Sequence, residues 1–214
     1  MLRKVTLAAT VASFAVLSAL PVQANESHAH IGHVMTKWKD TPDQKGFLPV
    51  AIEEAKVAET HAGLAASDQS DLSSMQLHSR HVLHALDPSV ETSGPGAGFG
   101  VLKATEGTHS HIGFAAGSDG ASDAVKLHAT HVSAAAEAVL KRTEEVKTLI
   151  AGILAAPDDK TAAPMVEKMK ASVSAITIGE DLNGDGSIGW ADGEGGLAVA
   201  KTHMGFMMDA EGLQ

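Results

Sequence analysis

Apolar residues recur along most of this chain at the three- and four-residue spacing of amphipathic helices. No stretch alternates apolar and polar residues as a half-buried strand does. We therefore expect an all-α protein. Asp71 stands where an N-cap is expected, and Pro88 and Pro157 follow the ends of two helical patterns. The predicted helices cover about 48–66, 71–87, 108–116, 122–156 and 162–178, and a last helix follows Gly193.

Two segments of the chain resemble each other. Residues 61–82 and 111–132 align without gaps and are identical at 8 of 22 positions. A third, weaker copy is split between the chain ends, near 30–33 and 199–206. Each copy reads as a helix, a turn and a second helix, and such units stack as helical pairs. We expect an antiparallel helical bundle built from helical-hairpin repeats, in one domain over 25–214. The repeats are placed at about 48–87 and 100–140.

The repeats carry two histidine motifs. His-x-x-His-Val occurs three times, and three further histidines, outside those steps, begin a His-x-Gly step. These motifs hold nine of the 12 histidines, which argues that the nine have a common role. His28, His84 and His109 lie outside the motifs and could complete the ligand shells or lie at their rim. The nine are His30, His33, His61, His78, His81, His111, His128, His131 and His203.

Histidines three positions apart lie on one face of a helix. A His-x-Gly histidine from a neighbouring helix would complete a set of three imidazoles. Three neutral imidazoles with an open fourth position suit Zn²⁺, Cu²⁺ or Ni²⁺. The repeat alignment predicts these triads: His61 with His78 and His81, His111 with His128 and His131, and His30 with His33 and His203.

A b-type haem is the other group that these histidines could hold. Glycine two residues after His61, His111 and His203, with alanines nearby, would leave flat space beside a porphyrin. Facing histidines inside a bundle can bind haem axially, which would make the protein an electron carrier. Few aromatic residues and no basic cluster are present to pack the ring or hold its propionates.

The first 24 residues read as a secretory signal peptide that is cleaved after Ala24. Arg3 and Lys4 precede an apolar run from Val5 to Leu20, and small residues follow. The mature protein is expected in the periplasm or outside the cell, with no membrane span. Its 14 basic residues against 26 acidic residues give a net charge of −12. This charge and the lack of a basic cluster disfavour nucleic acid as a partner.

The chain has no cysteine, so neither a disulfide framework nor a thiolate metal site can form. Covalently attached c-type haem is excluded for the same reason. No serine elbow, Cys/His pair or His-Glu-x-x-His motif is present, and the carboxylates show no acid/base pair. A binding or carrier protein is therefore favoured over an enzyme.

A separate metal motif lies at residues 181–192, which read Asp-Leu-Asn-Gly-Asp-Gly-Ser-Ile-Gly-Trp-Ala-Asp. This segment resembles the EF-hand calcium loop, especially its dockerin-type version, which closes with aspartate. The resemblance implies calcium bound in an EF-hand-like unit at about 162–212, where the loop would position the last helix and His203. It assigns as ligands the side chains of Asp181, Asn183, Asp185 and Asp192 and the carbonyl of Ser187.

The sequence supports two hypotheses. The first is a periplasmic metalloprotein that carries several transition ions or haems, with a structural calcium site and a redox or metal-handling partner. Its divided third triad could be completed within one chain or across a homodimer. The second is a calcium-stabilised interaction module whose histidines are not ligands.

Overall fold

The computed structural model describes residues 25–213, and it folds them into seven α-helices and one short 3₁₀ helix, with no β-strand in that range. The expected signal peptide, residues 1–24, lies outside the described residues. No helix of the described part has the length and apolar character that crossing a membrane requires. The helices are α1 (Glu26–Met35), η1 (Pro42–Gln44), α2 (Phe47–Ala65), α3 (Leu72–Leu86), α4 (Val101–Gly117), α5 (Asp123–Ala155), α6 (Asp159–Ile178) and α7 (Leu197–Glu211).

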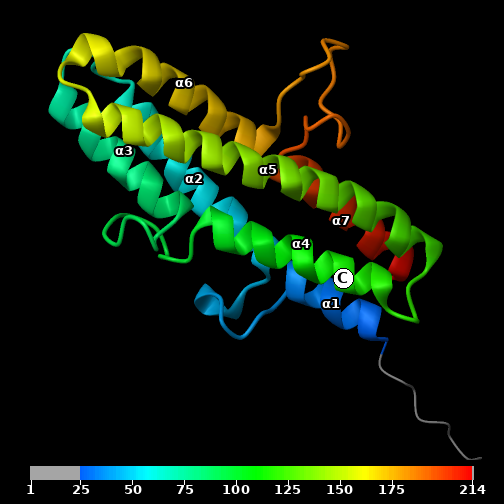
Figure 1. The fold of residues 1–214 in the computed structure, drawn as a ribbon. Coiled ribbons are helices and arrows are strands. Elements are labelled where there is room, and N and C mark those ends of the chain that lie inside the picture. Colours follow the sequence, from blue (N-terminus) through cyan, green and yellow to red (C-terminus); the bar gives the residue numbers. More distant parts are fainter. Residues whose placement is uncertain (1–24, 214) are drawn as a thin grey trace, which may run out of the picture.

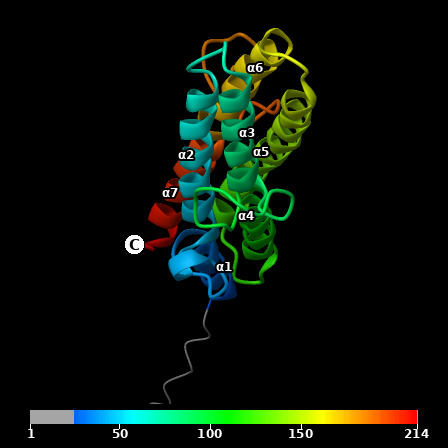
Figure 2. The same ribbon diagram turned by 90° about the vertical axis from the view of Figure 1, so that its left-hand side faces the viewer.

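The helices form an elongated bundle around α5, which runs along most of its length (Figure 1). Toward one end α5 packs against α3 and α6, and toward the other it packs against α4 and α7. Figure 2 places α6 at one end of the bundle and α1 at the opposite end. The two ends of the described chain meet there, because His28 Nε2 lies 2.7 Å from a carboxylate oxygen of Glu211.

Small side chains allow the helices to approach closely. In α2 the buried residues Ala51, Ala55, Ala58, Ala62 and Ala65 follow one another at alternating spacings of four and three, which places them on one face. Valine, isoleucine and methionine side chains from the other helices complete a single core cluster. The core therefore needs few aromatic residues, as an alanine-rich helical pattern implies.

The all-α bundle expected from the sequence is confirmed, and three helices have both boundaries close to their predicted positions. Helices α2, α3 and α5 each begin and end within one residue of the prediction. The Asp71 side chain accepts a hydrogen bond from the amide of Ser74, and Ser122 accepts one from the amide of Val125. Both residues are thus N-caps that satisfy a free amide in the first turn.

Two helices differ from the sequence expectation. Helix α4 begins at Val101, seven residues earlier than predicted, and its first turns bury Val101, Ala104 and Thr105. Helix α1 was not among the predicted helices. It is only ten residues long and its core face is two apolar residues, Ile31 and Val34, so its periodicity is weak.

Candidate metal centres

The nine motif histidines form three groups of three, and each group lies between two helices. Within residues 25–213 these are the only groups of three histidine or acidic side chains whose ligand atoms all lie within 4.8 Å of one another. In each group one helix supplies a His-x-x-His pair and the other supplies one His-x-Gly histidine. Site A is His30, His33 and His111 (α1 and α4), site B is His61, His78 and His81 (α2 and α3), and site C is His128, His131 and His203 (α5 and α7).

The same atom of every imidazole points into its site. In site A, Nδ1 of His111 lies 3.0 Å from Nδ1 of His30 and 3.2 Å from Nδ1 of His33. In site B the corresponding distances from the central His61 are 3.0 and 3.3 Å. In site C those from the central His203 are 3.2 and 3.3 Å. Three separate helix pairs have thus produced one arrangement.

The residues beside the histidines explain why they meet at a helix seam. The valine that follows each His-x-x-His step is fully buried. The residue directly after each central His-x-Gly histidine is fully buried as well. The histidine, one residue before its buried neighbour, is rotated about 100° from the core face of the helix. It therefore lies at the edge of the seam, half-buried, facing the next helix. The buried neighbours are Val34, Val82 and Val132, and Ala62, Ile112 and Met204.

The structure confirms one of the three predicted triads and corrects the other two. His61 does join His78 and His81. His111 was expected to join the pair on α5, but it joins the pair on α1, and His203 takes its place on α5. Helices α4 and α5 do pack together, but α4 turns its histidine flank toward α1 and α5 turns its own toward α7. The prediction was wrong because it assumed that helices adjacent in the sequence turn their histidines toward each other.

The electrostatics of the sites favour neutral imidazoles. Burial, followed by the nearby His33 and His30, lowers the pKa of His111 to about 4. At neutral pH such a group holds no second proton, so a nitrogen lone pair is available to a cation. The pKa is also lowered, in each case mainly by burial, at His33, His61, His81, His131 and His203.

Hydrogen bonding alone does not account for these contacts. A neutral imidazole Nδ1 carries either one hydrogen or one lone pair, so the central histidine can satisfy only one of its two neighbours. A cation at the centre would instead accept a lone pair from each ring. Three nitrogens bound to one tetrahedral Zn²⁺ ion at its usual bond length stand ~3.3 Å apart. The observed separations of 3.0–3.3 Å are close to that value.

Aromatic side chains surround site A, a feature that the sequence analysis did not anticipate. The Trp38 ring lies 4.8 Å from that of His111, and the Phe47 ring stacks on His111 at 5.3 Å. On the solvent side, Phe114 lies 5.3 Å from His30 and is 55% exposed. Trp38 and Phe47 are far from His111 in sequence, so only the fold reveals the contact.

Site C has a similar neighbourhood. Trp190 stacks on His131, with ring centroids 4.1 Å apart and planes 19° from parallel. Phe206 lies 5.7 Å from both His128 and His203. Phe206 directly follows the His-x-Gly step of His203 in the sequence, whereas nothing in the spacing of Trp190 indicates a contact with His131.

The three histidines outside the motifs are separate from the sites. His28 and His109 each lie within hydrogen-bonding distance of a glutamate, Glu211 and Glu137 respectively. His84 is buried, and its Nδ1 lies 2.8 Å from the carbonyl oxygen of Glu91. These contacts are structural, and the three residues are not part of any triad.

The segment that resembles a calcium loop turns its polar side chains onto its own backbone. Asp181 accepts hydrogen bonds from the amides of Gly184 and Gly186, and Asn183 accepts one from Asp185. Asp185 in turn accepts one from the Ser187 amide. Residues 181–188 are exposed, and in the described structure Asp181, Asp185 and Asp192 do not converge within 4.8 Å.

Glu194, two residues after the segment that resembles a calcium loop, binds the backbone of this loop. It is only 3% exposed. One carboxylate oxygen accepts hydrogen bonds from the amides of Leu182 and Asn183, and the other accepts one from Gly189. The buried carboxylate thus ties the beginning of the loop to its end.

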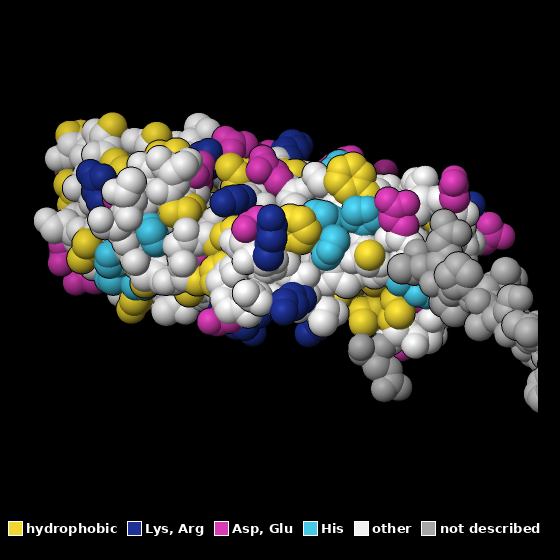
Figure 3. Space-filling model, turned by 90° about the horizontal axis from the view of Figure 1, so that it is seen from below, with side chains coloured by type: hydrophobic (Ala, Val, Ile, Leu, Met, Phe, Trp, Pro, Cys, Tyr) yellow, Lys and Arg dark blue, Asp and Glu magenta, His cyan; other side chains and the backbone are white. Residues whose placement is uncertain are grey.

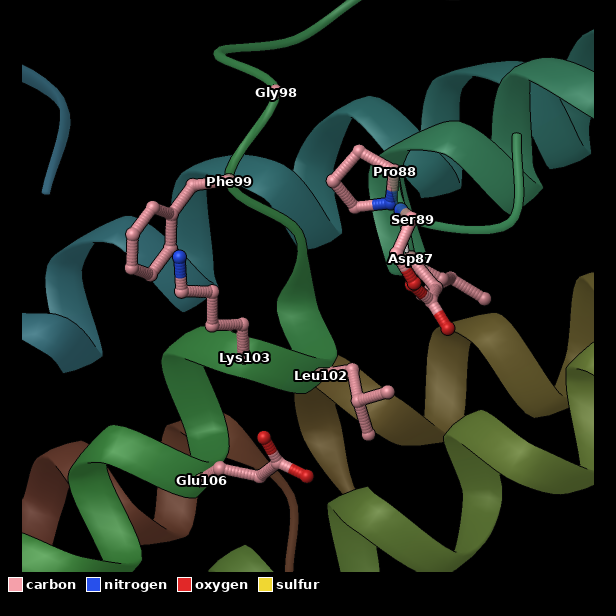
Figure 4. A pocket seen from close by; sticks show the side chains of 9 residues that line it. Asp87, Pro88, Ser89, Gly98, Phe99, Leu102, Lys103 and Glu106 are labelled. Atoms are coloured by element: carbon pink, nitrogen blue, oxygen red, sulfur yellow. Dashed lines mark hydrogen bonds between the residues drawn. The ribbon is translucent and has the colours of Figure 1, made fainter. Parts of the chain in front are cut away.

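A surface cavity lies away from the three sites. It measures about 540 Å³ and is formed where α3 ends and α4 begins (Figure 4). The Lys103 ammonium lies over the Phe99 ring there, and Asp87 is paired with Lys147. The histidines instead reach the surface in separate groups beside hydrophobic side chains (Figure 3). The cavity is lined by Leu86, Asp87, Pro88, Ser89, Gly98, Phe99, Leu102, Lys103 and Glu106.

No family model, curated protein or solved structure matches this chain. The geometry of the three sites is therefore what indicates a function. That geometry offers three imidazole nitrogens to one cation, three times over.

Proposed function

We propose that this protein binds transition-metal ions, one at each of sites A, B and C, and serves as an ion carrier. The observation that supports this most strongly is the convergence of three Nδ1 atoms in every site. Neutral imidazoles suit Zn²⁺, Cu²⁺ or Ni²⁺, and three of them leave a fourth position open for exchange. An export signal and a periplasmic metal-handling partner remain predictions from the sequence.

The same distances favour an ion over haem. The two axial nitrogens of a bis-histidine haem would lie on opposite faces of the porphyrin, about 4 Å apart for two metal–nitrogen bonds of ordinary length. The paired Nδ1 atoms are 3.0–3.3 Å apart, which leaves no room for a ring between them. Haem binding and electron transfer would require the triads to open.

Ion content after dialysis tests the proposal. Purified protein incubated with Zn²⁺ should retain three equivalents, measured by elemental analysis. His61→Ala, His111→Ala and His203→Ala should each reduce the content to two. His28→Gln and His109→Gln, which change histidines outside the triads, should leave it at three. Absence of retained zinc, copper or nickel would refute the proposal, and a Soret band on haem addition would support the haem alternative.

We also propose a structural calcium site at residues 181–192, which rests on the resemblance of this segment to an EF-hand loop. Calcium would require Asp185 and Asp192 to turn inward from their present exposed positions. Trp190 lies within the loop and can sensitise the luminescence of Tb³⁺, an ion that substitutes for Ca²⁺. Luminescence that Ca²⁺ displaces, and that is lost in Asp181→Ala, would support the site, and no luminescence would refute it.

A further inference from the structure

The chain has two tryptophans, and they contact two different triads. The Trp38 ring lies 4.7 Å from that of His33 and 4.8 Å from that of His111, in site A. The Trp190 ring covers His131 of site C at 4.1 Å. Each indole therefore lies directly against imidazoles that would bind an ion.

The backbone fixes Trp38 in place. Its amide faces the carbonyl oxygens of Gln44 and Lys45, and its own carbonyl accepts a hydrogen bond of 2.8 Å from the Thr41 hydroxyl. These bonds close the segment between α1 and α2 into a compact loop. The loop holds the indole between site A and Phe47, whose ring centroid is 5.4 Å away.

Trp190 is positioned by the loop between α6 and α7. The amide of the preceding residue, Gly189, donates to the buried carboxylate of Glu194. The guanidinium of buried Arg142, on α5, donates to the carbonyls of Gly193 and Glu194. The loop is thereby fastened to the helix that carries His131, so the stacking follows from the fold.

Site B has no such cover. Within the described part of the chain, the rings in contact with those of His61, His78 and His81 are only one another's. Leu64 holds the position that Phe114 and Phe206 hold in the other sites, three residues after the central histidine, and it is 41% exposed. Among the described residues, site B therefore lacks the aromatic rings that flank sites A and C.

We infer that Trp38 and Trp190 retain the ions in sites A and C, and that site B is the site that readily exchanges its ion with other molecules. This inference rests on the proposed function. Ion transfer to another molecule begins when an incoming donor atom reaches the open coordination position. An indole beside the site shields it from that donor and from water, whereas no indole or phenyl ring of the described residues contacts site B.

Release to a chelator tests the inference directly. Protein loaded with three equivalents of Zn²⁺ is mixed rapidly with a chromophoric chelator, and absorbance is followed in time. We expect a fast phase of one third of the zinc and a slower phase of two thirds. His61→Ala should remove the fast phase and leave the slow one.

Variants of the tryptophans identify their contribution. Trp190→Leu should move half of the slow phase to a rate ~3- to 10-fold higher, the factor typical of one aromatic contact. Trp190→Phe should restore most of the slow rate, because it keeps a ring against His131. Trp190 is 37% exposed, so its replacement should not prevent folding, and helical content measured by circular dichroism checks this. Trp38→Leu and Trp38→Phe form the matching pair for site A.

A spectroscopic signature separates this role from a general effect on folding. In Trp38→Phe the remaining indole is Trp190, and Cu²⁺ bound in site C should quench its fluorescence. His203→Ala should abolish that quenching, whereas His61→Ala should not. Release of three equivalents in a single phase, or a fast phase that survives His61→Ala, would overturn the inference while leaving the proposed function intact. Failure to retain zinc at all would refute the proposed function instead.

Discussion

Nδ1 of His30 lies 3.0 Å from Nδ1 of His111, although 81 positions separate the two residues in the chain. His128, only 17 positions after His111, belongs to a different triad. This relationship makes the assignment of ligands testable by combining substitutions.

Replacing two histidines of the same site should remove one bound ion from the protein. Replacing one histidine in each of two sites should remove two. His30→Ala combined with His111→Ala should therefore leave two equivalents of Zn²⁺. His111→Ala combined with His131→Ala should leave one. The grouping suggested by the sequence repeat predicts the reverse order, so elemental analysis of these two double variants decides between the pairings.

Acid should destabilise the metal-free protein before its carboxylates become protonated. The pKa of His111 is about 4 in the folded protein, below the value of ~6.5 that an imidazole has in an unfolded chain. Between these values the unfolded chain binds more protons than the folded protein. The contribution of His111 to the free energy of unfolding is therefore fully present above pH ~6.5 and is lost as pH drops toward 4. The melting temperature should decline through this window, and less steeply in His111→Leu. An equal decline in both proteins would contradict the assigned pKa.

Two glycines of α4 should respond in opposite ways to alanine. A Cβ at Gly113 would meet no atom within 4 Å, so Gly113→Ala should stabilise the helix by ~0.5–1 kcal/mol. A Cβ at Gly107 would lie 2.4 Å from the Phe47 ring, so Gly107→Ala should cost ~1–3 kcal/mol. Urea unfolding measures both changes. Zinc content should stay at three in Gly113→Ala, because an ion, unlike a porphyrin, needs no flat space beside that residue.

Arg142 should be among the most sensitive positions outside the sites. It is buried, and its guanidinium donates to the carbonyls of Gly193, Glu194 and Gly195. Arg142→Met would leave these carbonyls without their donor and should cost ~2–4 kcal/mol in urea unfolding. The matched control is Lys141→Met. Lys141 is exposed and forms only a surface pair with Glu145, so the expected cost is below ~0.5 kcal/mol.

The fold was largely predictable because its helices carry their own signals. Caps at Asp71 and Ser122 and the alanine row of α2 are local features, readable without knowledge of the partners. Helix α1 escaped prediction because histidines occupy positions where a longer apolar stripe would otherwise appear.

The membership of the sites was predictable, but their pairing was not. All nine motif histidines lie in triads, because the spacing of the motifs places each histidine beside the buried face of its helix. The 17-residue interval, however, is the same for His61 and His78, which meet, and for His111 and His128, which belong to different triads. Which helix faces which is decided by packing of the whole bundle. The contact of Trp190 with His131 depends on the same long-range packing.

Because each triad joins two helices, a bound ion would act as a reversible crosslink in a chain that has no cysteine. Site B would close a hairpin of 17 residues, whereas site A would tie His30 to a residue 81 positions away and site C would tie His128 to one 75 positions away. Closing longer loops restricts the unfolded chain more. Removal of metal should therefore loosen α1 and α7 first, at the two ends of the described chain. The degree of order of these two helices would then depend on how much metal is bound.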